Sequence, residues 1–236
     1  MRYALAVFDM AGTTVADPGY VTQAFVEAMT AAGHAIGPDA VQPLMGYRKP
    51  DAIEQLLGDA ASRPLVDRIH GDFVQRMLQC YRNHPSVAAL PGADEVFSHL
   101  RAHGVAVALN TGFSRDIAEA IVQRLGWNTR IDAVIGSDEV AAGRPAPDMI
   151  QALMRHLRIT DSRQVAKVGD TEVDIQEGRN AGVGLVVAVT TGARSRQVLQ
   201  GHAPDRIIGH LHALPQLLGL PPLQAAATSM PQRVAL

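Results

Sequence analysis

Carboxylates, hydroxyls and a guanidinium group follow short apolar runs at four places in the chain. They occur in the segments "FDMAGTT" (8–14), "LNTG" (109–112), "GRPAPD" (143–148) and "VGDTEVD" (168–174). The side chains that could do chemistry there are Asp9, Thr111, Arg144, Asp170 and Asp174. Mg²⁺ prefers oxygen ligands such as carboxylates, and a guanidinium group with hydroxyl and amide donors binds phosphate oxygens. The set therefore indicates a site for a divalent cation and a phosphoryl group.

Small residues beside these side chains add candidate phosphate donors. Gly12 and Thr13 follow Asp9 in a glycine-containing turn, and Gly112 follows Thr111. Each polar residue taken singly has a structural explanation, because an Asp or Thr at a strand end commonly caps a turn or a helix. The whole set, in this order along the chain, is better explained by one site.

A parallel sheet would bring these residues together. Short apolar runs predict buried strands at 3–9, 105–110, 132–136, 164–170 and 184–190. Helical patterns lie between them, at 114–125, 146–158 and 172–181, with a further helix expected to start near Ala93. This alternation predicts an α/β fold whose sheet is covered on both faces. Ligands bind at the carboxyl ends of such strands, where the polar residues stand.

One long interval breaks the alternation. Between residues 17 and 83 the chain contains no convincing strand, only apolar residues at helical spacing. We therefore expect a core formed by 1–16 and 84–236, with a helical cap formed by 17–83. The last segment, 221–236, has no clear periodicity.

Composition argues against several function classes. The chain has 236 residues, a net charge of −2 and no basic run interleaved with aromatic residues, so we expect no nucleic-acid partner. The opening "MRYALAVFDM" is too short an apolar run for a signal peptide or a membrane span. The single cysteine, Cys80, allows no internal disulfide. These features favour a cytoplasmic protein without a membrane partner, and a homodimer is compatible with them.

The four segments resemble the motifs of the haloacid dehalogenase (HAD) superfamily, in the same order, over about residues 3 to 215. The resemblance implies a Rossmann-like core and an Asp9 nucleophile that forms an aspartyl-phosphate. It also implies that Asp170, Asp9 and the Ala11 carbonyl oxygen bind Mg²⁺, that Asp174 supports the metal site and that Thr111 holds the phosphoryl group.

Two departures from the general superfamily pattern resemble the phosphonatase (phosphonoacetaldehyde hydrolase) family. HAD phosphatases carry a second Asp two residues after the nucleophile, which protonates the leaving group, whereas this chain has Ala11. The third motif usually contains a lysine, whereas this chain has Arg144 at that position. The phosphonatase family also carries a cap lysine in a Met-Gly-x-x-Lys segment, and "MGYRK" matches it with Lys49.

Lys49 explains how a carbon–phosphorus bond could break without that acid. Only Lys49 and Lys167 are lysines among the 21 Lys and Arg residues, and we interpret Lys167 as a structural residue beside the sheet. An imine between Lys49 and an aldehyde or ketone would accept the electrons of the broken bond as an enamine. Arginine cannot form that imine, because its guanidinium group is effectively never deprotonated. The predicted substrate is therefore a 2-oxoalkylphosphonate, either phosphonoacetaldehyde or a substituted analogue.

The sequence is also compatible with other functions. The family His, Cys and Tyr that manage protons and water correspond here to Ala52, Gly19 and Phe113, so proton handling or the substrate must differ. One alternative is a HAD phosphomonoesterase of a small metabolite such as phosphoglycolate, which would not need Lys49. Another is a non-catalytic binding protein with the same fold, against which the retained nucleophile and metal-site carboxylates count.

Overall fold

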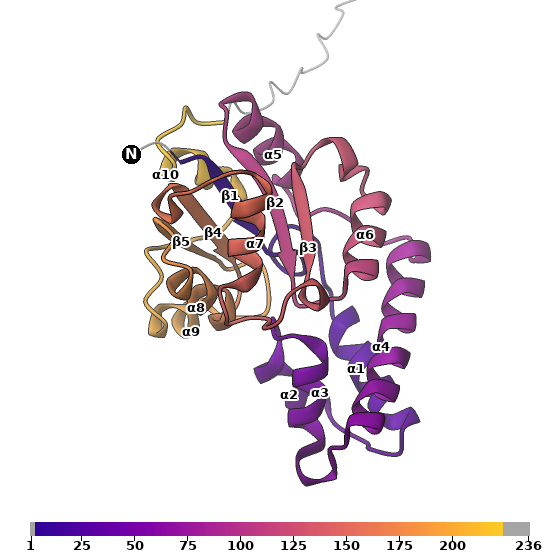
Figure 1. Ribbon diagram of the computed structural model, residues 1–236. Helices are drawn as coiled ribbons and strands as arrows, with labels where there is room; N and C mark the ends of the chain where they lie inside the picture. Colours follow the sequence, from indigo (N-terminus) through magenta and orange to yellow (C-terminus); the bar gives the residue numbers. More distant parts are fainter. Residues whose placement is uncertain (1–2, 224–236) are drawn as a thin grey trace, which may run out of the picture.

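The computed structural model describes residues 3–223 and contains one six-stranded parallel sheet. Its strands lie in the order β3-β2-β1-β4-β5-β6 (Figure 1). Their bounds are β1 Leu5–Phe8, β2 Ala106–Thr111, β3 Ala133–Gly136, β4 Val165–Gly169, β5 Leu185–Val189 and β6 Arg206–Ile208. The α/β prediction and the five predicted strands are confirmed. The sixth strand was missed because it has only three residues, begins with the exposed Arg206 and presents no apolar run.

Helices cover both faces of the sheet because side chains alternate along each strand. Ala6 and Phe8 of β1 pack with α5 (Ala93–Ala102) and α6 (Arg115–Arg124). Leu5 and Val7 face the other side and pack against α7 (Asp148–His156). On that side α8 (Glu172–Asn180) and α9 (Arg196–Gly201) cover β5. The short α10 (Leu214–Leu217) packs against α5.

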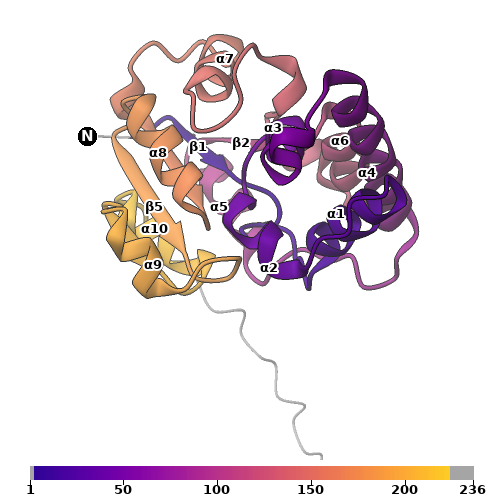
Figure 2. The same cartoon turned by 90° about the horizontal axis from the view of Figure 1, so that it is seen from below.

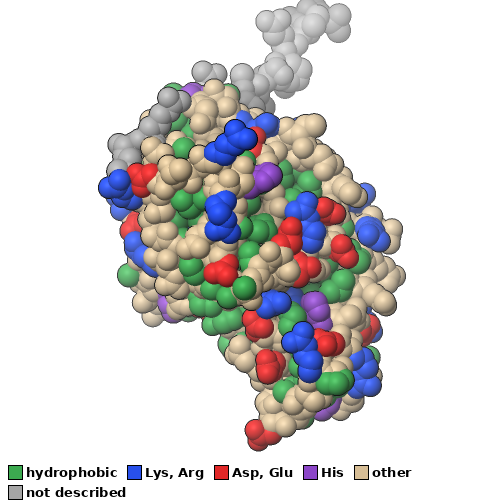
Figure 3. Space-filling view, in the orientation of Figure 1, with side chains coloured by type: hydrophobic (Ala, Val, Ile, Leu, Met, Phe, Trp, Pro, Cys, Tyr) green, Lys and Arg blue, Asp and Glu red, His purple; other side chains and the backbone are tan. Residues whose placement is uncertain are grey.

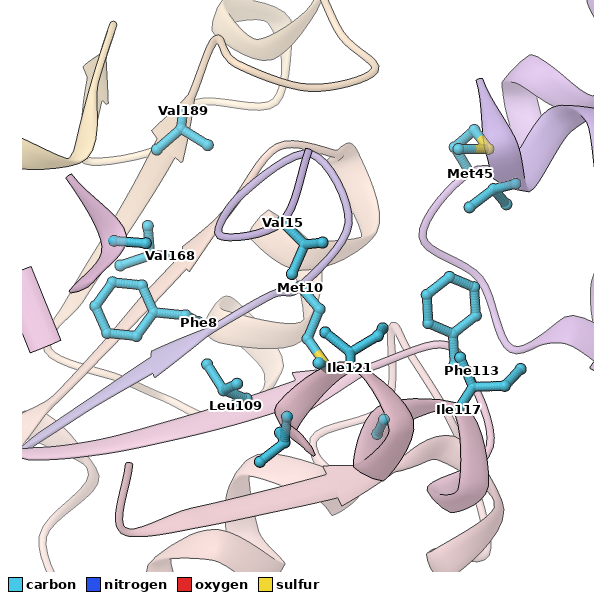
Figure 4. Close-up of a cluster of buried hydrophobic side chains, with 14 of the residues drawn as sticks. Phe8, Met10, Val15, Met45, Leu109, Phe113, Ile117, Ile121, Val168 and Val189 are labelled. Atoms are coloured by element: carbon cyan, nitrogen blue, oxygen red, sulfur yellow. The ribbon is translucent and has the colours of Figure 1, made fainter. Parts of the chain in front are cut away.

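The centre of the core lies where β1 meets its two neighbours. Phe8 pairs in register with Leu109 on β2 and with Val168 on β4, and all three side chains are fully buried. Figure 4 shows these side chains along adjacent strands, with Met10 and Val15 in the loop that follows β1. The apolar contact anchors the end of β1, so the residue that comes next, Asp9, has a well-defined position.

The segment from residue 20 to residue 83, here called the helical insert, contains only helices and turns. Its helices are α1 (Tyr20–Ala31), α2 (Pro38–Val41), α3 (Lys49–Leu57) and α4 (Arg63–Asn83). α1 packs on α4, which also contacts α6 of the sheet-containing part. Figures 1 and 2 show the insert beyond the carboxyl ends of the strands, and Figure 3 shows it as a narrower lobe. The domain boundaries expected from the sequence stay a prediction.

Two further expectations from the sequence concern membrane-spanning helices and the last segment of the chain. Among the described residues, no helix is long and apolar enough to span a membrane. The segment 221–236, expected to lack regular structure, lies outside the described residues from 224 onward.

Candidate active site

The turn after β1 places Asp9 at the carboxyl end of the central strand. The Asp9 amide donates to the Val168 carbonyl oxygen at 2.9 Å, so the residue is still held by the neighbouring strand β4. The turn then closes on Met10, whose carbonyl oxygen accepts from the amides of the residues that follow. Gly12 has φ +85° and packs so closely that a Cβ atom would come within 2.7 Å of Asp170 Oδ2. Glycine is therefore required at this position.

The hydrogen-bond donors of Gly12 and Thr13 already have acceptors within the protein. The Gly12 amide donates to the Val15 carbonyl oxygen at 2.8 Å, and the Thr13 amide donates to that of Met10 at 3.2 Å. The Thr13 hydroxyl donates to Asp170 Oδ1 at 2.9 Å. The structure thus gives Gly12 and Thr13 a part in positioning Asp170, and their contact with phosphate stays a prediction.

Three carboxylates meet at the end of β1 and β4. Asp9, Asp170 and Asp174 are buried, and each offers an oxygen that lies within 4.8 Å of the others. Burial, followed by repulsion from Asp9 and Asp174, raises the pKa of Asp170 well above its usual range. Burial also raises the pKa of Asp9, although Arg144 opposes the effect. A buried carboxylate cluster of this kind is suited to a divalent cation, which would favour the ionised forms.

Asp174 differs from the other two carboxylates because it pairs with two buried cations, Arg144 and Lys167. Its Oδ2 accepts from the Thr171 hydroxyl at 2.6 Å and from the Thr171 amide at 3.2 Å. Its Oδ1 lies 3.0 Å from nitrogen atoms of both Arg144 and Lys167. Asp9 and Asp170 are therefore better placed as direct metal ligands, with Asp174 holding the cations beside them.

Arg144 is almost completely buried and reaches Asp9. Its Nη1 donates to Asp9 Oδ1 at 2.6 Å, and its Nη2 donates to the carbonyl oxygen and to Oδ1 of Asn110, both at 2.7 Å. Burial alone would lower the pKa of Arg144, but the carboxylates of Asp174, Asp9 and Glu177 outweigh it and raise that pKa. The guanidinium group is therefore a permanent cation beside Asp9.

Lys49 begins α3 and points from the insert into the same site. Only 4% of the residue is exposed, and Nζ donates to the Tyr47 carbonyl oxygen at 3.0 Å. The amine also lies 5.1 Å from the Phe113 ring centroid and 5.6 Å from that of Phe25. Burial is the main cause that lowers the pKa of Lys49 to about 8, and Arg144 lowers it further while Asp9 opposes both. Roughly a tenth of this amine is neutral at pH 7, far more than for a free lysine.

One narrow cavity of about 20 Å³ joins the two halves of the site. The sheet-containing part contributes Asp9, Ala11, Thr111, Gly112 and Asp170, and the insert contributes Val21, Met45 and Lys49. A space of this size holds about one water molecule. The structure is therefore a closed form, in which Asp9 and Lys49 line one narrow space.

Comparison with known proteins identifies the family. A family model described as haloacid dehalogenase-like hydrolase matches residues 3–182. The chain belongs to this family of hydrolases. Phosphonoacetaldehyde hydrolase of Latilactobacillus sakei subsp. sakei is 33% identical to this hydrolase over 224 residues, covering 86% of this chain and 79% of the relative. The protein of the same name from Paraburkholderia xenovorans is 30% identical over 238 residues, covering 92% and 88%.

Solved structures support the same fold for this hydrolase. A phosphonoacetaldehyde hydrolase-like protein from Oleispira antarctica superposes with a TM-score of 0.79 at 21% identity, covering 93% of this chain and 92% of that one. A putative phosphoglycolate phosphatase from Lactobacillus delbrueckii subsp. bulgaricus superposes with a TM-score of 0.77 at 23% identity, covering 92% and 99%. These identities establish the fold alone. The expected family and the Rossmann-like core are confirmed.

The second motif lies at the boundary with the insert. Thr111 ends β2 and is 2% exposed, and its hydroxyl accepts from the Phe113 amide at 3.2 Å. A Cβ atom on Gly112 would meet the Tyr47 carbonyl oxygen and lie 2.8 Å from that of Gly46. Gly112 therefore allows the insert loop that precedes Lys49 to approach β2 closely.

Sequence reasoning missed part of this site. Asn110, Lys167 and Glu177 are fully buried and contact one another, and Asn110 and Glu177 also contact Arg144. The interpretation of Lys167 as a structural residue beside the sheet is incomplete, because its ammonium group lies 3.0 Å from Asp174 Oδ1. The available signals were the lysine inside an apolar strand and the glutamate in "DIQEGRNAG", yet neither says what it faces.

Proposed function

We propose that this hydrolase cleaves the carbon–phosphorus bond of a 2-oxoalkylphosphonate, with Lys49 and Asp9 as its two covalent groups. The observation that carries the proposal is that both side chains line one closed cavity although they come from different parts of the chain. A phosphate monoester needs no amine beside its phosphoryl group, whereas an oxoalkylphosphonate has a carbonyl group two atoms from phosphorus. The relatives named phosphonoacetaldehyde hydrolase support the same choice.

The carbonyl end of the substrate would react with Lys49. The neutral amine adds to the carbonyl carbon, water leaves and a protonated imine forms. A carboxylate oxygen of Asp9 then attacks phosphorus, the carbon–phosphorus bond breaks and its electrons pass into the imine to give an enamine. Ala11 carries only a methyl group, so no side chain there protonates a leaving group. The enamine needs no such acid at the moment of cleavage.

The cycle closes by two hydrolyses. The enamine takes up a proton at carbon, and water then releases the aldehyde or ketone from Lys49. A second water cleaves the acyl phosphate on Asp9 and releases inorganic phosphate. Thr111, Gly112 and Arg144 would hold the phosphoryl oxygens, with further donors from the Gly12–Thr13 turn.

Mg²⁺ fits the donor set that the structure provides. The four buried carboxylates of Asp9, Asp170, Asp174 and Glu177 outnumber the three buried cations, Lys49, Arg144 and Lys167, so one negative charge is in excess even while Lys49 is protonated. The residues that would hold the ion are Asp9 and Asp170, with the Ala11 carbonyl oxygen, and Asp174 would support them. When bound, the ion would reduce the repulsion between Asp9 and the phosphoryl oxygens.

A substrate panel tests the proposal. Phosphonoacetaldehyde, 2-oxopropylphosphonate and phosphoglycolate are each incubated with enzyme and Mg²⁺, and phosphate release is measured. We expect release from an oxoalkylphosphonate, and little from phosphoglycolate, because general acid catalysis worth about 10²- to 10⁴-fold is missing. Rapid hydrolysis of phosphoglycolate without any reaction of the phosphonates would establish the phosphomonoesterase instead.

A further inference from the structure

A fully buried polar layer lies directly behind Arg144. Asn110 on β2, Lys167 on β4 and Glu177 on α8 are each 0% exposed. Asn110 Nδ2 donates to both carboxylate oxygens of Glu177, at 2.8 Å and 2.9 Å. Lys167 Nζ donates to Asn110 Oδ1 at 2.6 Å and lies 3.0 Å from Glu177 Oε2. The three side chains therefore form a closed network.

This layer holds the part of Arg144 that does not face Asp9. Arg144 Nε lies 3.2 Å from Glu177 Oε2, and Nη2 donates to Asn110 at 2.7 Å. Nη1 contacts Asp9 Oδ1 at 2.6 Å and lies 3.0 Å from Asp174 Oδ1. A guanidinium group is planar and rigid, so the hydrogen bonds from Nη2 and the ion pair near Nε restrict where Nη1 points. A lysine at position 144 could not satisfy these three sets of partners, because it has one nitrogen.

Glu177 connects every member of the layer. It accepts from Asn110 and lies within ion-pair distance of both Lys167 and Arg144. A carboxylate buried to this extent is costly unless it is paired, and here it is paired with two cations. Glu177 lies on α8 and contacts neither Asp9 nor Asp170, so any effect on catalysis must pass through its partners.

We propose that Glu177 is a positioning residue that holds Arg144, together with Asn110 and Lys167, in the orientation required to bind a phosphoryl group beside Asp9. The proposal rests on the proposed function only in that the site must bind a phosphoryl group. It does not depend on whether the substrate is a phosphonate or a phosphate ester.

A double-mutant cycle with inorganic phosphate as the probe tests this role. Phosphate affinity is measured by calorimetry in Mg²⁺ for the wild type, Glu177→Gln, Arg144→Gln and the double variant. Losing or weakening a charge-assisted hydrogen bond to phosphate costs about 10- to 10²-fold in affinity, so we expect each single variant to bind phosphate at least about 10-fold more weakly. If Glu177 acts through Arg144, the double variant binds within about 3-fold of Arg144→Gln, because coupled sites are not additive.

Arg179→Gln is the matched control. Arg179 lies on the same helix and pairs with Asp205 on the exposed side, where its side chain is 47% exposed. This variant should bind phosphate as the wild type does. Circular dichroism and thermal unfolding show whether each variant is folded. If Glu177→Gln does not fold, Glu177→Asp replaces it in the cycle, because it keeps the charge and withdraws the carboxylate, and the same non-additivity is expected.

The outcomes separate this proposal from the proposed function. Wild-type affinity in a folded Glu177 variant, or losses that multiply in the double variant, would overturn the positioning role. A wild-type protein that does not bind phosphate at all would overturn both. A non-additive cycle in a protein that releases no phosphate from any oxoalkylphosphonate would support the positioning role and reject the phosphonate substrate.

Discussion

At the scale of single residues, Lys49 is the side chain whose environment matters most. It is buried among aromatic rings, its amine donates to a backbone carbonyl oxygen and its pKa is lowered to about 8, with burial as the main cause. The same burial that makes the amine nucleophilic also costs stability while it is protonated. Reactivity and stability at this position therefore respond to pH in linked ways.

Lys49→Arg should keep the positive charge and lose carbon–phosphorus cleavage by about 10³-fold or more, because a guanidinium group does not form an imine. Borohydride added with phosphonoacetaldehyde should inactivate the wild-type enzyme and leave a reduced adduct on Lys49. Mass spectrometry of the digested protein locates the adduct, and Lys167 serves as the internal control. An active Lys49→Arg enzyme, or an adduct found elsewhere, would reject the imine.

The pH dependence follows from the lowered pKa of Lys49. Between about 8 and the ordinary 10.5, the unfolded chain holds this proton and the folded chain does not, so stability rises with pH in that window. Below pH 8 the penalty is fully present, at about 3 kcal/mol for a shift of this size. Lys49→Met should therefore stabilise the protein by up to about 3 kcal/mol at pH 7, and the gain should decrease above pH 8 and vanish above about pH 10.5.

Urea unfolding at several pH values measures that difference. In parallel, kcat/KM of the wild type should increase with pH and level off near pH 8, where the amine of Lys49 becomes neutral. A stability gain that is the same at pH 7 and at pH 10 would show that the folded-state amine is not perturbed.

Asp9→Asn should abolish phosphate release by at least about 10⁴-fold, the order found when a covalent nucleophile is removed. The fold should be kept, because Asn retains an oxygen that accepts from Arg144 Nη1. Chelation of Mg²⁺ by EDTA should also abolish activity in the wild type, and added Mg²⁺ should restore it. Comparable turnover of Asp9→Asn would mean that no aspartyl-phosphate forms.

At the scale of elements, the loop before α3 packs closely against the end of β2 because glycines stand at the contact. A Cβ atom on Gly112 would meet the Tyr47 carbonyl oxygen, the same atom that accepts from Lys49 Nζ. On the other side, a Cβ atom on Gly46 would lie 2.5 Å from Thr171 Oγ1 at the start of α8. The absence of side chains at these two positions therefore determines how near Lys49 comes to Asp9.

Gly112→Ala should move the loop that carries Lys49 and reduce kcat/KM by about 10²-fold, since displacements near 1 Å have effects of that order. Crowding of this kind costs about 1–3 kcal/mol of stability. Gly37→Ala is the control, because Gly37 lies in the insert and has nothing within 4 Å of the added Cβ. Kinetics and thermal unfolding of both variants check the prediction, which fails if Gly112→Ala retains wild-type activity.

At the scale of the whole molecule, the site is complete only when the insert lies against the sheet-containing part. The cavity of about 20 Å³ holds about one water molecule, so we expect a larger ligand to enter only when the insert moves away. Arg194 joins the two parts in the closed form. Its Nε and Nη2 contact Glu172 at 2.6 Å and 2.7 Å, and its Nη1 donates to the Gln42 carbonyl oxygen of the insert at 2.7 Å.

Arg194→Lys should destabilise the closed form, because one ammonium group cannot bind Glu172 in a bidentate manner and reach Gln42 as well. Hydrogen bonds from charged groups contribute about 1.5–3 kcal/mol, so we expect KM to rise about 10-fold or more. Small-angle scattering should show a larger radius of gyration. Arg63→Lys is the control, because its pair with Asp67 lies on the exposed face of α4. Unchanged KM and scattering would show that Arg194 does not hold the parts together.

The strands and the residues at their ends depend on local pattern and could be predicted from the amino-acid sequence. Short apolar runs located five of the six strands, and Asp9, Thr111 and Asp170 stand where those strands end. Parallel strands bring their carboxyl ends to one edge of the sheet, so the order of the elements alone predicted that these residues lie near one another. The three-residue β6 is too short to leave such a pattern.

Contacts between side chains that are distant along the chain depend on how the elements pack and could not be predicted in this way. Lys49 comes from α3 and reaches the cavity of Asp9 because Gly46 and Gly112 let two backbones approach, a contact that no spacing in the sequence expresses. Glu177 and Lys167 are 10 positions apart and lie on a helix and a strand, yet their charged groups lie 3.0 Å apart behind Arg144. Local periodicity reports which face of an element is buried. The partners on that face depend on how the elements pack, and a single sequence does not record that packing.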